Sequence, residues 1–148
     1  MVKRAASPKK FFSSEEKERI LQAIREAEGR TSGEIRVYLE RRAKGDLMDA
    51  AKKTFERLGM TKTKKRNGIL IYFSLTDQTF ALLGDRGIHD KVKDVFWKEV
   101  AAVMEEAFLK QDFAGGLEAG IRKIGEKLKI YFPREAGDRN ELPDFTSP

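Results

Sequence analysis

Apolar positions recur along this chain at two spacings, one typical of helices and one typical of strands. Four stretches have helical spacing, and in each the apolar residues fall on one side of the predicted helix. Ser13 and Glu16 predict a capping box at the start of the first helix, and Asp46 is the predicted N-cap of the second. The apolar positions are Ile20, Leu21, Ile24 and Ala27; Leu47, Met48, Ala51, Phe55 and Leu58; Val92, Phe96, Val100, Val103 and Phe108; and Phe113, Leu117, Ile121, Ile124 and Leu128.

Three predicted strands lie between these helices. Residues 34–40 alternate between apolar and polar, whereas 69–73 is a continuous apolar run, typical of a strand covered on both faces. Residues 76–78 predict a tight turn, after which residues 79–83 return antiparallel. The order of elements predicts an α/β fold, an αβα sandwich around a small mixed β-sheet flanked by about four helices. We expect the first two strands to be parallel, joined by a right-handed crossover through the second helix.

The length of 148 residues fits a single domain with one proper core. We predict a flexible basic arm at residues 1–11, one domain at 12–133 and an irregular C-terminal tail at 134–148. No stretch approaches the roughly 20 consecutive apolar residues of a membrane span. The basic N-terminus also lacks the apolar segment of a secretory signal peptide. We therefore expect a cytoplasmic protein, and a monomer.

Composition limits the chemistry that the chain can perform. It contains no cysteine and one histidine, His89, so thiolate zinc sites, cysteine nucleophiles and paired-histidine sites are excluded. A bound metal would be held mainly by oxygen, which favours calcium, magnesium or manganese. The net charge of +6 weakly favours anionic partners. Nucleic acid is not expected among them, because the basic run 62–66 contains no aromatic residue.

The predicted topology brings charged residues from distant parts of the chain to the two ends of the sheet. A hard cation and a phosphate group could bind at either end, and the sequence leaves both open. Structural interpretations also remain open: Asp46 as a helix cap, Asp77 as a turn residue, residues 84–87 as a tight loop and Glu34 as an exposed strand-edge charge. One end gathers Glu34, Arg66, Asn67 and Asp85, and the other gathers Glu40, Arg41, Asp46, Thr76 and Asp77. The candidate metal ligands are Asp85, Asp77, Asp46 and Glu34, and the candidate phosphate ligands are Arg66, Asn67 and Arg86.

Several short motifs together resemble the TPM domain family. They comprise Gly-Glu-Ile-Arg-Val at 33–37, Arg-Asn-Gly-Ile-Leu at 66–70, Gly-Asp-Arg-Gly-Ile at 84–88, Phe96-Trp97, residues 113–117, Phe132-Pro133 and residues 140–144. The last motif, at residues 140–144, resembles the sequence found in a short, stand-alone bacterial subgroup of the family, which has no signal peptide or membrane anchor. The resemblance covers nearly the whole chain from about Phe11 onward.

The resemblance implies an αβα sandwich. Some relatives bind calcium or magnesium, so the resemblance also implies a divalent metal, calcium or magnesium, as the cofactor. Phosphatase or nucleotide-hydrolysing activity is attributed to some relatives, so a phosphate-containing small molecule is one possible partner. Other relatives act as accessory factors for membrane protein complexes. Two hypotheses follow: a cation-binding domain with metal-dependent phosphohydrolase activity, or a non-catalytic interaction or assembly module that binds a protein of a membrane-associated complex. The motifs of P-loop nucleotidases and of serine hydrolases do not occur in the sequence.

Overall fold

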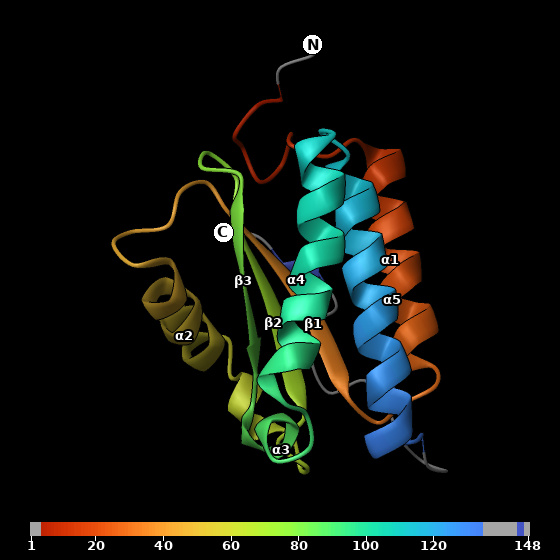
Figure 1. Cartoon of the computed structure of the whole chain (residues 1–148). Helices are drawn as coiled ribbons and strands as arrows, with labels where there is room; N and C mark the ends of the chain where they lie inside the picture. The colour runs from red at the N-terminus through yellow and green to blue at the C-terminus, as the bar shows by residue number, and fades with distance from the viewer. Residues whose placement is uncertain (1–3, 135–144, 147–148) are drawn as a thin grey trace.

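The computed structural model describes residues 4–134 and 145–146 and has the predicted α/β architecture (Figure 1). The capping box at Ser13 and the Asp46 cap both form, and each helix begins at the residue after its cap. A short helix, α3, was not predicted separately, because four residues carry too little periodicity. The elements are α1 (Ser14–Glu28), β1 (Glu34–Glu40), α2 (Leu47–Arg57), the 3₁₀-helix η1 (Met60–Lys62), β2 (Gly68–Ser74), β3 (Thr79–Gly84), α3 (Arg86–His89), α4 (Asp94–Leu109), α5 (Phe113–Tyr131) and β4 (Phe145–Thr146).

The sheet has the order β3-β2-β1-β4. As predicted, β1 and β2 are parallel with α2 between them in the chain, and β2 pairs antiparallel with β3. The short β4 lies within the segment predicted to be an irregular tail and pairs with Val37 and Tyr38 of β1. A two-residue strand has no periodicity of its own, so the sequence pattern gives no sign of it.

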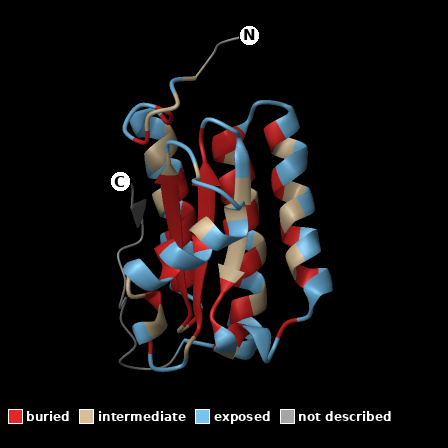
Figure 2. Ribbon diagram, turned by 90° about the vertical axis from the view of Figure 1, so that its left-hand side faces the viewer, coloured by how far each residue is buried: buried red, intermediate tan, exposed pale blue. Residues whose placement is uncertain are grey.

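Helices cover both faces of the sheet, which confirms the αβα sandwich. Figure 1 shows α1, α4 and α5 on one side of the strands and α2 on the other. The larger core lies under the three helices and the smaller one under α2. Every residue of β2 is buried, as Figure 2 shows for the central strands, because this strand lies between both cores. Within the described residues no helix has the length and hydropathy of a membrane span.

The described part of the predicted N-terminal arm, residues 4–11, contacts the domain. The guanidinium of Arg4 donates to both carboxylate oxygens of Glu16, at 2.8 and 2.7 Å. It also lies 5.3 Å from the ring centroid of Phe11 and 5.6 Å from that of Phe113. These cation–π contacts and the ion pair attach the arm to the start of α1 and to α5.

Hydrogen bonds from Arg4 lower the pKa of Glu16 from its ordinary value of 4.5 to about 2. A carboxylate with a lowered pKa in the folded state stabilises the protein above its ordinary pKa, and we expect this stabilisation to be lost as the pH falls from about 4.5 to about 2. Arg4→Met should move the Glu16 titration, followed by carboxyl ¹³C NMR, upward toward the ordinary value. Arg19→Met removes an arginine that pairs with Glu118 instead and should leave it unchanged. An equally low pKa in Arg4→Met would show that Arg4 is not the cause.

Candidate functional site

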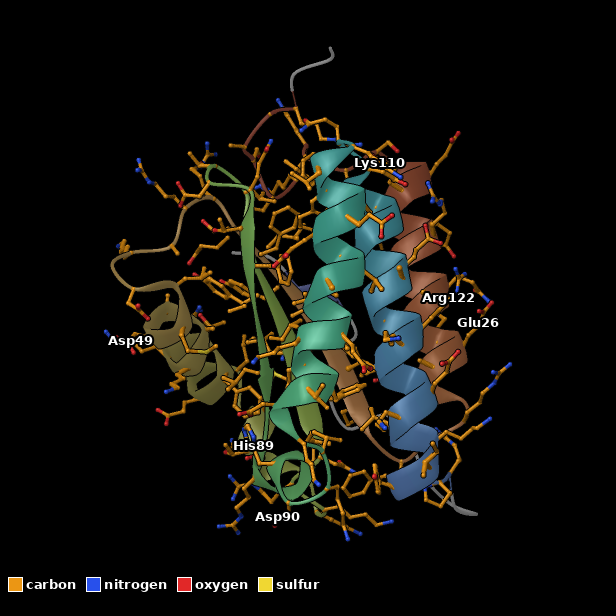
Figure 3. The ribbon with its side chains drawn as sticks, viewed as in Figure 1. Glu26, Asp49, His89, Asp90, Lys110 and Arg122 are labelled. Atoms are coloured by element: carbon orange, nitrogen blue, oxygen red, sulfur yellow. The ribbon has the colours of Figure 1, made fainter. Side chains whose placement is uncertain are left out.

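The predicted charged residues gather at two opposite ends of the sheet. Glu34 lies opposite Gly68 in the parallel register, and the backbone N–H of Asp85 donates to the carbonyl of the same glycine at 2.9 Å. Glu34, Asn67 and Asp85 therefore share one end. Figure 3 shows His89, the last residue of α3, and Asp90 at this end of the molecule, and Lys110 at the opposite end.

Arg66 and Asp85 form a bidentate ion pair at the first end. Arg66 Nε and Nη2 donate to the two carboxylate oxygens of Asp85 at 2.6 and 2.8 Å. The Asp85 side chain is only 6% exposed, and it also accepts from the backbone N–H of Arg86 at 2.8 Å as the N-cap of α3. The hydrogen bonds with Asp85 raise the pKa of Arg66. Both residues were predicted as ligands, and in this structure they bind each other.

The other predicted residues at this end differ in their burial. Glu34, at the start of β1, and Asn67, just before β2, are buried, whereas Arg86 is exposed. The Asn67 side-chain amide donates to Ser32 Oγ at 3.5 Å, and its backbone N–H donates to Thr63 Oγ1 at 3.2 Å. Burial and these hydrogen bonds fix Asn67 within the loop that leads into β2.

Asp46 and Asp77 lie at the second end, and both are exposed. Asp46 accepts from the Asp49 backbone N–H at 3.0 Å, which is the capping role foreseen as an alternative. Asp77 accepts from Ser74 Oγ at 3.2 Å and lies 3.8 Å from Nε of the mostly exposed Arg42. These contacts are longer and more exposed than those of Asp85, so the Asp77 carboxylate is held less tightly.

A pocket of about 600 Å³ lies beside Asp77, and we call it the hairpin pocket. Two exposed carboxylates line it, Asp77 from the β2–β3 turn and Glu105 from α4. Gln78, Thr79 and Gln111 are the neutral polar residues of the lining, and its apolar residues are Leu47, Phe80, Phe108, Leu109 and Phe113. Within the described residues there is no group of three or more histidine or acidic side chains arranged to hold a metal. A cation in this pocket would therefore take two carboxylates and complete its shell with neutral oxygens and water.

Sequence reasoning found Asp77 but missed its partners in the pocket, Glu105 and Gln111. Glu105 lies on the polar side of an amphipathic helix, where a carboxylate usually faces only solvent. Gln111 lies in the short connection between α4 and α5 and has a positive φ of 63°, which a sequence pattern does not mark for a non-glycine residue. The packing of α4 beside β3 decides that these residues meet Asp77.

This arrangement defines the chain as a three-layer α/β domain with acidic residues at both ends of a mixed sheet. Residues 6–127 match the TPM domain, so the chain belongs to the TPM domain family. None of the curated proteins matches it.

The solved structures that are similar to this one include two determined by NMR. The BA42 protein from the psychrophilic bacterium Bizionia argentinensis, determined by NMR, is 41% identical, with a TM-score of 0.90 over 97% of this chain and 100% of that one. The N-terminal domain of a protein from P. gingivalis is 23% identical, with a TM-score of 0.62 over 82% of this chain and 78% of that one. At that identity the second likeness extends to the fold alone.

Proposed function

We propose that this TPM domain binds a divalent cation, calcium or magnesium, in the hairpin pocket. The observation that carries the proposal is the presence of two exposed carboxylates, Asp77 and Glu105, from separate elements in one oxygen-lined pocket. Calcium takes six to eight oxygen ligands, and magnesium keeps several of its waters, so two carboxylates with neutral oxygens form a weak site for either ion.

The contacts of the carboxylates favour this pocket over the opposite end of the sheet. To bind a cation, Asp77 would give up only a hydrogen bond of 3.2 Å from Ser74 and an ion pair of 3.8 Å with Arg42, whose side chain is 71% exposed. Such an exposed pair contributes little stability, about 0 to 1 kcal/mol. Asp85 is itself buried and would have to give up two hydrogen bonds from Arg66, at 2.6 and 2.8 Å, and one from the Arg86 backbone N–H at 2.8 Å. A buried carboxylate with three short hydrogen bonds is harder to redirect to a cation than the exposed carboxylate of Asp77.

Titration with calcium and with magnesium, followed by ¹H–¹⁵N NMR, tests the proposal. We expect shift changes that cluster at Asp77, Gln78, Glu105 and Gln111 and saturate with added cation. Asp77→Asn and Glu105→Gln should each weaken binding by about tenfold, since removing one of two carboxylates removes half of the ligand charge. Glu106→Gln is the matched control, because Glu106 is the adjacent exposed carboxylate on α4 and does not line the pocket.

Two results would contradict this assignment. Shift changes centred on Glu34, Asn67 and Asp85 would move the site to the other end of the sheet. Equal losses in Glu105→Gln and Glu106→Gln would show that the cation responds only to the general charge of α4.

Hydrolysis of a phosphate ester would require more than the cation. A bound cation can activate water and polarise a phosphoryl group, and an arginine would have to hold the phosphate. Arg42 is the candidate at this pocket, because its Nε lies 3.8 Å from Asp77, whereas Arg66 and Arg86 lie at the opposite end. Magnesium-dependent release of phosphate from p-nitrophenyl phosphate, compared between the unaltered protein and Arg42→Ala, separates catalysis from cation binding alone.

A further inference from the structure

The outer edge of β3 is the starting point of a separate inference. β3 is the last strand on its side of the sheet, and no element in the described part of the chain pairs with its outer side. The opposite edge differs, because β4 adds a short parallel strand to β1 there. Figure 1 shows β3 with α2 on one face and α4 on the other, so these helices cover the faces of the sheet.

β3 lacks the features with which proteins usually protect an edge strand. Charged side chains, proline and bulges prevent a second strand from pairing with an exposed edge. The six residues of β3, Thr-Phe-Ala-Leu-Leu-Gly, include no charge and no proline, and every one pairs in regular register with β2. Phe80, Leu82 and Leu83 are only partly buried, so apolar surface accompanies the open backbone.

The hydrogen-bond pattern identifies which backbone groups face outward. In an antiparallel pair, successive residues point their N–H and C=O groups alternately toward and away from the partner strand. The Asp85 N–H donates to the Gly68 carbonyl. The backbone N–H and C=O groups of Asp85, and by the same alternation those of Leu83 and Ala81, therefore point toward β2. The N–H and C=O groups of Phe80, Leu82 and Gly84 therefore face away from the sheet.

The hairpin pocket adjoins the first residues of this edge, since Thr79 and Phe80 line it. Two carboxylates and no lysine or arginine line it, in a chain whose net charge is +6. Arg42, which lies 3.8 Å from Asp77, offsets one of these two charges, so Glu105 carries the net negative charge of the pocket. Leu109, on its lining, is 86% exposed. An apolar surface with a negative local charge beside an open strand edge is complementary to an extended segment that carries apolar and basic side chains.

We propose that the outer edge of β3 binds an extended basic peptide segment of a partner protein as an added strand. The backbone of the segment pairs with Phe80, Leu82 and Gly84, and a lysine or arginine side chain of the segment lies beside Asp77 and Glu105. Main-chain pairing supplies the affinity, and the pocket supplies the preference for a basic side chain. This inference does not rest on cation binding, although a cation in the pocket would compete with the basic side chain.

The probe is the synthetic peptide acetyl-Lys-Val-Thr-Val-Lys-Val-Thr-Lys-amide, added with EDTA present so that the cation proposal cannot affect the result. We expect amide shift changes along β3. Hydrogen exchange at Phe80, Leu82 and Gly84 should slow by about tenfold at a peptide concentration about ten times Kd, because only the unbound fraction exchanges. Glu105→Lys should weaken binding by about twofold to fivefold, the usual size for an exposed charge pair, and Glu106→Lys should change it less.

Two altered peptides test the mechanism without changing the protein. N-methylation of two adjacent central residues blocks hydrogen bonding from both edges of the peptide and should abolish the β3 shifts. Replacement of its lysines by glutamates should weaken binding.

Three results would overturn the proposal: equal binding of the N-methylated peptide, shift changes confined to surfaces other than β3, and equal or tighter binding of the glutamate peptide. Concentration-dependent shifts at β3 in the protein alone would assign the edge to a second copy of this chain, and would also overturn it.

Discussion

Asp85→Ala is expected to lower the free energy of unfolding by about 2 kcal/mol, the upper end of the usual cost of losing a helix N-cap. The loss of the ion pair adds little, because Arg66 is partly exposed and water can solvate its charge once Asp85 is removed. The same substitution removes the N-cap of α3, because Asp85 accepts from the Arg86 backbone N–H. Urea denaturation followed by circular dichroism measures the change.

A double-mutant cycle with Arg66→Ala separates the ion pair from the cap. We expect a measurable coupling between the two positions, because their side chains contact each other directly, but a small one, because Arg66 is partly exposed. If the two losses simply add, the pair contributes nothing and the cap explains the effect. The folded Asp85→Ala variant should also keep the cation affinity of the unaltered protein. A loss of that affinity would show that Asp85 is a ligand and would place the site at the end of the sheet that holds Glu34 and Asn67.

Phe73→Ala is expected to lower the free energy of unfolding by about 3–5 kcal/mol, the usual cost of removing a buried phenylalanine ring. Phe73 is fully buried in β2 and lies at the centre of an aromatic cluster. Its ring centroid is 5.0 Å from that of Phe108, 5.5 Å from that of Phe11 and 6.0 Å from that of Phe113. The residue therefore joins α4, α5 and the N-terminal segment to the sheet, and all of these contacts are lost together.

Val95→Ala provides the control for Phe73→Ala. Val95 is 61% exposed on α4, so the substitution should change stability by less than about 0.5 kcal/mol. Urea denaturation of both variants gives the comparison, and an unchanged m-value shows that the denatured states are alike. A loss below about 1 kcal/mol in Phe73→Ala would contradict the central role of this ring.

Much of the fold was predictable because its signals are local. The capping box at Ser13 and Glu16, the Asp46 cap and the apolar run at 69–73 each lie within a few residues of one another, and each formed as predicted. The parallel pairing of β1 with β2 followed from the helix between them, because parallel strands need a long connection. The predicted convergence of Glu34, Asn67 and Asp85 at one end of the sheet followed from that topology in turn.

The sequence by itself determined the four longer helices, the three longer strands, their directions and the set of charged residues available at each end of the sheet. Only the tertiary structure decided how these residues are used: Asp85 pairs with Arg66, Asp77 shares a pocket with Glu105 of α4, β4 covers one edge of the sheet and the outer edge of β3 has no partner strand in the described chain. Helix and strand patterns depend on neighbours a few residues apart. The pairing of side chains from different elements depends on how those elements pack, which no local pattern specifies.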